Sequence, residues 1–352
     1  MTSNSGVNVL YRQKSFPVLQ NRVYASQSDA ISCVTGDIEV VEDLQTGLVR
    51  NIAFDPSIID YDANYDNEQG HSTFFKDHLE VVSEIIQRTM QLSDLVEVGC
   101  GKGLFLELLS SKGATITGFD PTYEGSNPKI EKRYFEPGVM APSNGLVLRH
   151  VLEHIPEPVS FLEQLKVANG GKGLIYIEVP CFDWICENKV WFDIFYEHVN
   201  YFRLSDFDRI FGRILDKGRL FGGQYLYIVA DLASLGTPEM GSDERLPFPE
   251  DFLNIPTHPE KNIVIWGGAS KGVIFALLMM RAGYNVKAAV DINPAKQGKY
   301  LPVTGVPVIS PDEAMASLQQ GSDVYVMNSN YTDEIRRITS DRFNLIETDT
   351  RK

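Results

Sequence analysis

The stretch LVEVGCGKGLFLELL (Leu95–Leu109) decides the fold. Its first apolar run, Leu95–Val98, predicts a buried strand, and residues 102–112 predict a helix that ends at Gly113. Glycines between the two let the backbone turn sharply and let a ligand approach where a Cβ atom would clash. These glycines are Gly99, Gly101 and Gly103. A strand, a glycine turn and a helix in this order are typical of the first unit of a doubly wound α/β sheet.

The alternation of strands and helices continues on both sides of this unit. Strands are expected at residues 115–119, 145–148, 174–179 and 225–230, and helices at 73–91, 158–168 and 204–211. The sequence therefore predicts an α/β fold with a doubly wound sheet.

A second, smaller unit of the same kind follows near the C-terminus. Ile263–Trp266 predicts a strand, Gly267–Gly272 a glycine turn and Val273–Ala282 a helix, and the strand Val286–Val290 ends at Asp291. We expect four parts. These are a small β-rich segment (1–55), a core (56–236), a proline-rich linker (237–259) and a C-terminal Rossmann-like domain (260–352).

Two carboxylates indicate the ligand of the first glycine loop. Asp120 lies 21 residues after Gly99 (120 − 99), at the end of the next strand, where it can accept hydrogen bonds from two ribose hydroxyls. Glu97 stands two residues before Gly99, where it would repel a pyrophosphate but suits a ligand with an ammonium and a sulfonium. This favours S-adenosylmethionine over a dinucleotide. We place Pro121 and His150 in the same cofactor-binding set.

RHVLEHIPEP (Arg149–Pro158) follows the third strand of the core and contains several candidate side chains. His150, Glu153 and His154 are candidates for catalysis, and an HxxxH pair on a helix can ligate a metal. No third ligand is evident in the sequence. We therefore expect no metal here and interpret these residues as shaping the loop that closes on the adenosyl group.

An aromatic segment, Phe182–Phe202, follows the fourth strand and contains the pair Glu197-His198. In open α/β sheets the ligand lies beyond the carboxyl ends of the strands, so this segment is expected at the edge of the site. There the pair indicates a partly buried imidazole whose basicity is tuned by a carboxylate. The alternative is a core histidine satisfied by hydrogen bonds.

Composition excludes several classes of function. The 352 residues include 32 basic and 47 acidic side chains, a net charge of −15, which disfavours nucleic acid as a partner. No apolar stretch is long enough to span a membrane, and the first residues lack the apolar core of a signal peptide, so we expect a cytoplasmic protein. The four cysteines form no CxxC pair, which indicates neither a zinc knuckle nor a disulfide framework.

Across most of its length the chain resembles the S-adenosylmethionine-dependent C-methyltransferases of nucleotide-linked deoxysugars. In the core, the resemblance includes YDNEQGHSTFFKDHL before the first glycine loop, and then EVGCGKG, HVLEHIPEP, EVP, YEHVNYF and FGGQYLYIV. Its most specific part is C-terminal, in WGGASKGVIFALLM, VDINPAKQGKYLPVTGVPVISPDE and NSNYTDEI.

The resemblance implies a class I methyltransferase core and a terminal Rossmann-like domain that helps to hold a nucleotide-sugar. Residues of the second glycine loop would then receive the diphosphate, together with a residue of the NSNYTDEI motif. The expected substrate-binding residues are Gly267, Gly268, Ser270, Lys271 and Asn328.

The sequence departs from the family at two places. Members usually carry an N-terminal zinc domain with four cysteines, but the matching region here has only Cys33, so zinc is not expected. The family often has a tyrosine two residues before the glutamate of the EH motif, and here that position is Phe195. Tyr196 and the upstream Tyr65 are the candidates to replace it.

These observations lead to one mechanistic hypothesis. His198 removes a proton next to the ketone of a 4-keto sugar nucleotide, Glu197 orients the imidazole, and Tyr196 or Tyr65 stabilises the enolate oxygen. The carbanion then takes the methyl group of the cofactor.

The same residues are compatible with other functions. With the same cofactor, His198 could deprotonate a hydroxyl and give O-methylation. An NAD-dependent oxidoreductase or epimerase would use Gly267–Gly272 with Asp291, and a further alternative is a nucleotide-sugar binding protein without catalysis. The sequence does not identify the sugar, the nucleotide, the acceptor atom or the oligomeric state.

Overall fold

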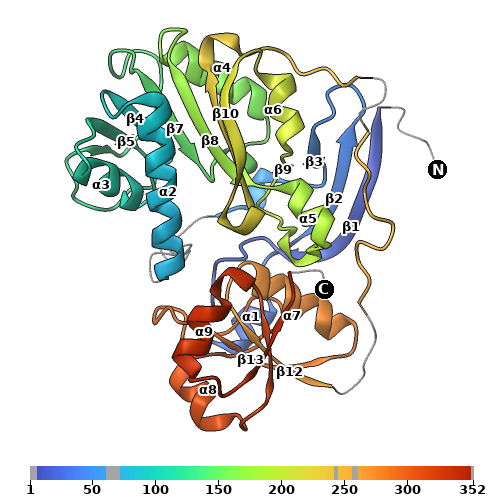
Figure 1. The fold of residues 1–352 in the computed structure, drawn as a ribbon. Coiled ribbons are helices and arrows are strands. Elements are labelled where there is room, and N and C mark those ends of the chain that lie inside the picture. Colours follow the sequence, from blue (N-terminus) through green and yellow to red (C-terminus); the bar gives the residue numbers. More distant parts are fainter. Residues whose placement is uncertain (1–5, 61–71, 242–244, 256–260, 350–352) are drawn as a thin grey trace.

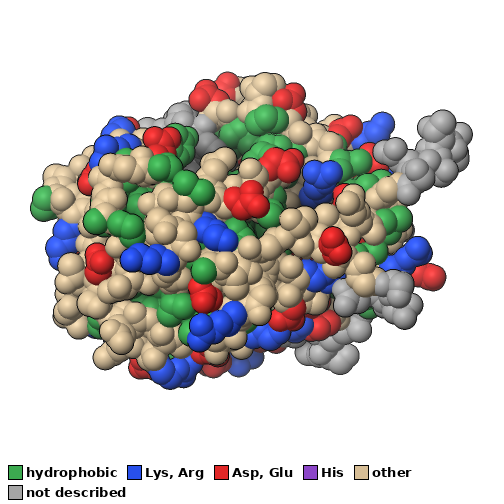
Figure 2. All heavy atoms as spheres, turned by 90° about the horizontal axis from the view of Figure 1, so that it is seen from above, with side chains coloured by type: hydrophobic (Ala, Val, Ile, Leu, Met, Phe, Trp, Pro, Cys, Tyr) green, Lys and Arg blue, Asp and Glu red, His purple; other side chains and the backbone are tan. Residues whose placement is uncertain are grey.

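The described part of the chain forms three β-sheets, which Figure 1 shows together with the helices around them. The structure is a computed structural model and describes residues 6–60, 72–241, 245–255 and 261–349. No helix in these ranges is long and apolar enough to cross a membrane. Acidic and basic side chains are interspersed on the face drawn in Figure 2.

The largest sheet has seven strands in the order β10-β11-β8-β7-β4-β5-β6. Its neighbouring strands pair in parallel, except that β11 runs antiparallel to both β8 and β10. The strands are β4 (Leu95–Val98), β5 (Ile116–Phe119), β6 (Ile130–Glu131), β7 (Gly145–Arg149), β8 (Leu174–Pro180), β10 (Ile214–Leu220) and β11 (Tyr225–Asp231).

Helices cover both faces of this sheet because its central strands are apolar on both sides. Along β4, Leu95 packs in the same core cluster as α2 and α3, whereas Val96 packs in the cluster of α4 and α6. Ser72 begins α2 by accepting a hydrogen bond from the backbone N–H of Phe75. The helices are α2 (Thr73–Met90), α3 (Leu104–Ser111), α4 (Pro158–Ala168), α5 (Phe182–Asn188) and α6 (Leu204–Ile210).

The C-terminal domain has a five-stranded parallel sheet in the order β14-β13-β12-β15-β16. Its strands are β12 (Asn262–Trp266), β13 (Asn285–Val290), β14 (Val308–Ile309), β15 (Asp323–Val326) and β16 (Asn344–Glu347). Its helices are α7 (Lys271–Arg281), α8 (Pro311–Ser317) and α9 (Thr332–Thr339). The predicted fold class, a doubly wound sheet followed by a smaller Rossmann-like domain, is confirmed.

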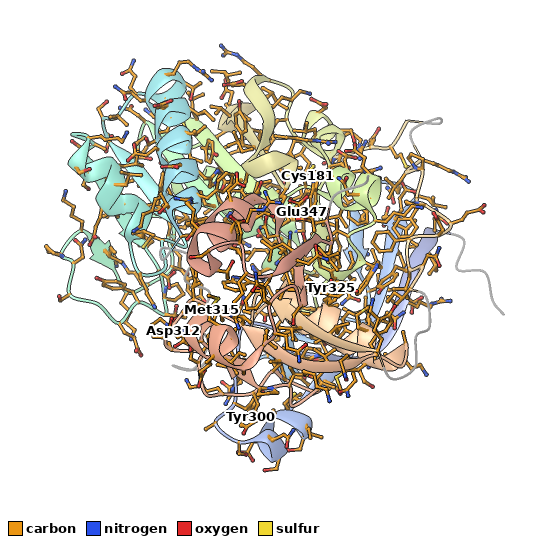
Figure 3. The ribbon with its side chains drawn as sticks, turned by 60° about the horizontal axis from the view of Figure 1, so that its bottom comes forward. Cys181, Tyr300, Asp312, Met315, Tyr325 and Glu347 are labelled. Carbon is orange, nitrogen blue, oxygen red and sulfur yellow. The ribbon has the colours of Figure 1, made fainter. Side chains whose placement is uncertain are left out.

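The N-terminal region forms a four-stranded antiparallel sheet that also contacts the C-terminal domain. The sheet contains β1 (Val7–Pro17), β2 (Thr35–Asp43), β3 (Val49–Asn51) and β9 (Asn200–Tyr201), in that order. Between β1 and β2, α1 (Gln27–Ile31) lies against the lower domain in Figure 1. Gln27 donates a hydrogen bond to the carbonyl of Gly305, and Tyr24 forms a β-bridge with Tyr300, labelled in Figure 3.

Short 3₁₀ helices complete the chain. They are η1 (Pro56–Ile58), η2 (Leu152–His154), η3 (Trp191–Asp193), η4 (Phe221–Gly223), η5 (Leu232–Ser234) and η6 (Ser329–Tyr331).

Several short elements were not predicted from the sequence, among them β6, β14, β16, α1 and α5. Two further differences concern the N-terminal sheet and the edge strands. The small N-terminal sheet is not confined to residues 1–55, because its fourth strand, β9, comes from the core region. Strands β1 and β10 were not predicted. Along β10 half-buried residues alternate with exposed ones, so an edge strand of this kind carries too few apolar residues to be recognised.

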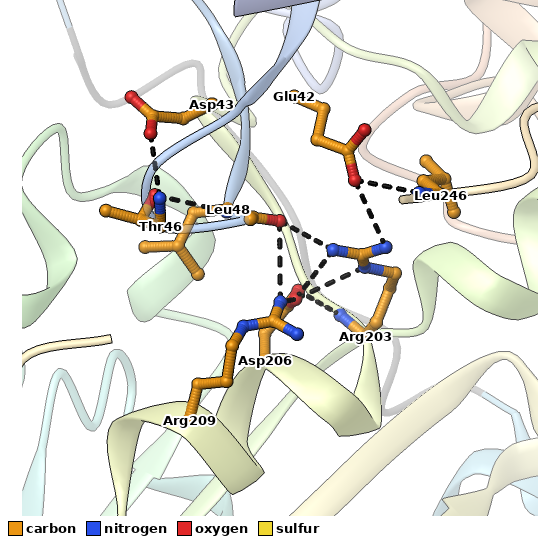
Figure 4. A network of polar contacts seen from close by, with 9 residues as sticks. Glu42, Asp43, Thr46, Leu48, Arg203, Asp206, Arg209 and Leu246 are labelled. Carbon is orange, nitrogen blue, oxygen red and sulfur yellow. Dashed lines mark hydrogen bonds and ion pairs between the residues drawn. The ribbon is translucent and has the colours of Figure 1, made fainter. Parts of the chain in front are cut away.

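A buried ionic network joins the N-terminal sheet to the core (Figure 4). Arg203, which precedes α6, donates to Asp206 Oδ1 and to the carbonyl of Gly47, at 3.0 and 2.5 Å. Its second Nη atom lies 3.6 Å from Glu42 Oε1, and that oxygen also accepts the N–H of Leu246. Both carboxylates and Arg203 are almost fully buried, so each charge depends on its partners.

We expect Arg203→Met to lower the free energy of unfolding by about 3–5 kcal/mol, because it removes the cation that faces the buried Glu42. The same change leaves the buried Asp206 with Arg209 as its remaining cation among the described residues. Arg12→Met is the matched control, since Arg12 pairs with Glu39 at an exposed position and its loss should cost less than about 1 kcal/mol. Urea unfolding of the two variants measures both effects. Equal losses would contradict the assigned role of the network.

Candidate functional site

A cavity of about 460 Å³ lies at the carboxyl ends of the core strands and extends to the C-terminal domain. Its wall includes the first glycine loop, the loop after β7, the aromatic segment and the second glycine loop. The predicted site residues on this wall are Glu97, Gly99, Gly101, His150, His198, Gly267, Ser270, Lys271 and Asn328.

The glycine loop after β4 needs its glycines for conformation and for space. Gly99, Gly101 and Gly103 have φ angles of +71°, +53° and +86°, in the left-handed region. A Cβ atom on Gly99 would lie 2.5 Å from Val151, and one on Gly103 would lie 2.5 Å from Ile130. The loop therefore packs closely against its neighbours while it lines the cavity.

Asp120 holds this loop in place from the end of β5. Its Oδ2 accepts the backbone N–H of Gly101 at 2.8 Å, and its Oδ1 accepts the N–H and hydroxyl of Thr122. Neither Asp120 nor Pro121 belongs to the cavity wall. Contact with a ribose therefore remains a prediction for both.

Glu97 is the buried acid of the cavity. It is 4% exposed, and its Oε2 has no hydrogen-bond partner within the described ranges. Burial raises the pKa of Glu97 to about 7, although the charge of Arg149 opposes the rise. A buried carboxylate oxygen without a partner, beside a glycine loop, fits the ammonium of S-adenosylmethionine. The missing partner is seen in the structure and does not depend on the sequence motif.

Glu178 at the end of β8 is the polar centre under the cavity. Its Oε1 accepts from Arg149, and it lies 3.0 Å from Nε2 of both His78 and His150. Its Oε2 accepts the hydroxyl of Tyr176 at 2.7 Å. Despite burial, this surrounding positive charge holds the pKa of Glu178 well below its usual range.

His150 bridges two carboxylates and is strained. Its φ is +51°, and its ring lies between Glu178 and Glu153, with Nδ1 3.5 Å from Glu153 Oε1. Burial alone would lower the pKa of His150, but the two carboxylates raise it to about 9. His150 is therefore an imidazolium at neutral pH and is not suited to act as a base.

His198 is the neutral imidazole of the cavity. It is 8% exposed, and its ring packs edge-on against Phe195 and His154. Burial, together with the nearby His154 and His150, lowers the pKa of His198 to about 3, although the charge of Glu153 opposes the fall. Its lone pair is therefore available for a proton at neutral pH.

Two residues expected beside His198 have other contacts. Glu197 Oε1 accepts the backbone N–H of Gln20 at 2.9 Å, and Glu197 is absent from the cavity wall. Tyr196 is also absent from it, and its hydroxyl accepts the N–H of Asp55 at 2.8 Å. Glu197 and Tyr196 therefore hold the N-terminal region, because they accept hydrogen bonds from the backbone N–H groups of Gln20 and Asp55. Tyr65 lies outside the described residues.

The carboxylate that faces the histidines is Glu153 instead. Ligand atoms of Glu153, His154 and His198 all lie within 4.8 Å of one another. The sequence had marked Glu153 and His154 as candidates, but nothing in it indicated that they would meet His198.

The second glycine loop has contacts that the sequence did not reveal. Lys271 donates to Gln224 at 2.8 Å and pairs with Asp193 at 3.1 Å, so this lysine joins α7 to the core. Ser270 bonds Asn21 through its hydroxyl, and Asn328 exchanges two hydrogen bonds with Gln224. These side chains line the cavity while they connect the domains, so their hydrogen-bonding groups are already engaged.

Asp291 holds the backbone of the second glycine loop by a hydrogen bond. Gly267 has a φ of +122°, and the N–H of Gly268 donates to Asp291 Oδ2 at 2.8 Å. Gly268 is not part of the cavity wall.

A buried lysine of the C-terminal domain was not predicted for the site. Lys296 lines the cavity, is 6% exposed and has no ion-pair partner within the described part of the chain. The only available signal was its place in VDINPAKQGKY, a motif of the family resemblance.

Comparisons with known proteins match two parts of the chain. Residues 48–214 match a methyltransferase domain, and residues 250–344 match a C-methyltransferase C-terminal domain. The chain is 23% identical to the C-methyltransferase NovU of Streptomyces niveus over 306 residues, which are 73% of this chain and 72% of that protein.

Solved structures overlap with the chain only in part. A complex of the plantazolicin methyltransferase BpumL has 21% identity and a TM-score of 0.29, covering 36% of this chain and 54% of that one. A putative O-methyltransferase from Nostoc punctiforme has 14% identity and a TM-score of 0.36, with 45% and 56% covered. The chain thus spans little more than half the length of these two proteins.

Both domain matches fall on the two sheets that meet at the cavity, and the first includes the glycine loop and Glu97. The chain is therefore an S-adenosylmethionine-dependent methyltransferase.

Proposed function

We propose that this methyltransferase transfers the methyl group to a carbon atom next to the ketone of a nucleotide-linked keto sugar, with His198 as the general base. The observation that carries the proposal is the position of His198. This buried, neutral imidazole faces the same cavity as the glycine loop and the C-terminal domain. The match of the C-terminal region to a C-methyltransferase domain, and the similarity to NovU, support carbon as the acceptor.

Residues of the core would hold the cofactor. The orphaned Glu97 Oε2 would accept the ammonium, the loop at Gly99–Gly101 would lie along the ligand, and Asp120 stands beside the loop for the ribose. When bound, S-adenosylmethionine supplies an electrophilic methyl group on a sulfonium.

Burial lowers the basicity of His198, and in this proposal nearby negative charge raises it again. A ketone acidifies the neighbouring C–H, and the lone pair of His198 accepts that proton, which then rests on the ring. Glu153 lies close enough to stabilise the imidazolium, and its charge already acts to raise the pKa of His198. A bound diphosphate would raise that pKa further, because nearby negative charge favours the protonated ring.

Lys296 is the residue we assign to the diphosphate. Its buried position without a paired carboxylate within the described chain leaves an uncompensated ammonium on the cavity wall. The diphosphate of the substrate would compensate this ammonium. The positive charge of Lys296 also offsets, at the cavity, the overall charge of −15 that would otherwise repel the diphosphate. Lys271 is less suited, because Asp193 and Gln224 already engage it.

We expect His198→Asn to lower turnover by at least about 10²-fold, because a general base typically contributes a factor of about 10²–10⁴ to the rate. The variant should still bind S-adenosylhomocysteine. The assay incubates the protein with nucleotide-sugar pools and an isotope-labelled methyl donor and detects the product by mass spectrometry. A C–CH₃ resonance in the NMR spectrum of the product supports the proposal, and an O–CH₃ resonance contradicts it. Wild-type turnover by the variant would remove His198 from the role of base.

We expect Gly99→Ala to weaken binding of S-adenosylhomocysteine by more than 10-fold, because the added Cβ atom meets Val151 at 2.5 Å and displaces the loop. Gly113→Ala is the matched control. Gly113 also has a positive φ, of +91°, but its Cβ would meet no atom within 4 Å. Both variants carry a similar backbone strain of about 1–2 kcal/mol. Calorimetry measures the affinity of both variants for S-adenosylhomocysteine and so separates a displaced loop from a general loss of stability. Equal affinities of the two variants would contradict the assignment of the Gly99 loop to the cofactor.

We expect Lys296→Gln to raise the KM for the nucleotide-sugar by at least 10-fold with a much smaller change in kcat, because the lysine binds a part of the substrate that does not react. Lys287→Gln is the control, since Lys287 lies exposed on β13 and outside the cavity wall. Steady-state kinetics measures both. An unchanged KM for Lys296→Gln would exclude the proposed contact.

A further inference from the structure

We propose that Glu153, His154 and His198 form a binding site for a divalent transition metal ion such as Zn²⁺, and that the ion blocks proton abstraction by His198. Within the described residues, this is the one group of three or more His, Cys, Asp or Glu side chains that lie close enough to hold an ion. The blocking half rests on the proposed function, whereas the binding half does not.

The three ligand atoms need little movement to reach an ion. All lie within 4.8 Å of one another, and ligands at about 2.0 Å from a tetrahedral Zn²⁺ are about 3.3 Å apart. Binding an ion would therefore bring any two of these atoms closer by at most about 1.5 Å. Two of the three residues are buried and the third is partly buried, so the site is protected from bulk water.

His154 is oriented as metal-binding histidines usually are. Its Nδ1 lies 2.9 Å from the backbone carbonyl of Glu197, so Nδ1 carries the proton and donates it to that oxygen. Nε2 consequently keeps its lone pair. A second-sphere hydrogen bond of this kind determines the tautomer before any ion arrives.

Glu153 supplies the independent indication of a cationic ligand. Glu153 is 1% exposed, and its Oε2 has no hydrogen-bond partner among the described residues. Its other oxygen lies 3.5 Å from Nδ1 of His150, so one oxygen stays available. Leaving such an oxygen unpartnered in a buried position is costly unless a cation binds to it.

The set of ligands differs from the one that the sequence suggested. In the HxxxH motif, His150 is engaged by Glu178 and Glu153, so it does not pair with His154 toward a shared ion. The third ligand is His198, which lies 44 residues after His154 (198 − 154) and reaches it through the fold. This explains why no third ligand is evident from local spacing.

The donor set favours transition ions over Mg²⁺ or Ca²⁺. Two imidazole nitrogens and one carboxylate oxygen suit Zn²⁺ and its neighbours, whereas Mg²⁺ and Ca²⁺ prefer oxygen ligands. Three protein ligands leave a coordination position open, and all three residues line the cavity. The lone pair of His198 that would bind the ion is the one that would accept the proton, so the two events exclude each other.

The test is a titration of chelator-treated full-length protein with Zn²⁺ alone, followed by calorimetry. We expect one ion per chain in the wild type, and affinity at least 10-fold weaker in both Glu153→Gln and His154→Asn. Glu157→Gln is the control, because Glu157 lies four residues further on with a side chain that is 78% exposed. No binding by the wild type, or equal binding by all variants, overturns the site.

A second measurement needs no variant and so does not depend on their folding. Co²⁺ bound to nitrogen and oxygen ligands shows d–d absorption without the intense thiolate charge-transfer band that a cysteine site produces. A thiolate band would place the ion at one of the four cysteines and overturn the proposal.

The blocking half is tested by turnover in the presence of Zn²⁺. We expect loss of turnover at the concentration at which the ion binds, and recovery when EDTA is added. Full turnover with the site occupied overturns this half. Zn²⁺ binding together with wild-type turnover by His198→Asn would instead reject the proposed base and leave the metal site standing.

Discussion

The arrangement around the cavity depends on a single buried charge, the carboxylate of Glu178. Removing a carboxylate from water costs several kcal/mol unless donors surround it. Here the donors come from different parts of the chain, His78 from α2, and Arg149 and His150 from the end of β7. Satisfying one ion therefore determines where α2 and the loop after β7 lie. The same demand explains why His150 tolerates a positive φ, because that conformation brings its ring to both Glu178 and Glu153.

This arrangement shifts the pKa values of two histidines at the cavity in opposite directions. His150 takes up a proton because two carboxylates face it, while His198 loses one because it is buried beside positive charge. Two imidazoles on the wall of one cavity thus have opposite protonation states at neutral pH. Such a division between neighbouring titratable groups is a general sign of acid–base chemistry.

Local patterns predicted the parts of the structure that depend on neighbouring residues. The apolar runs identified the central strands, and the cap at Ser72 and the glycine spacing identified the helix and turn that follow from them. Contacts between distant residues were beyond these patterns. Glu197 looked like the partner of the adjacent His198, yet its carboxylate accepts from Gln20, 177 residues away. Burial of a backbone donor decided that pairing, and burial is a property of the complete fold.

The same limit applies to the two glycine loops, which look alike in sequence. The first is open to the cavity with an orphaned acid beside it. The second is tied to the core through Lys271 and to the N-terminal region through Ser270. The glycine spacing thus predicted both turns. The side chains around each turn come from distant parts of the chain, so only the structure shows that the two loops have different contacts.

The position of β9 has a consequence for the order in which the chain folds during synthesis. The N-terminal sheet receives its last strand from Asn200–Tyr201, although its first three strands end at Asn51. At about 5–20 residues per second, a ribosome needs roughly 7 to 30 s to make the residues in between. During that interval the edge of β3 has no partner strand, and such an edge is prone to pair with other chains. Since β9 begins two residues after His198, the step that closes this edge also brings the imidazole to the cavity.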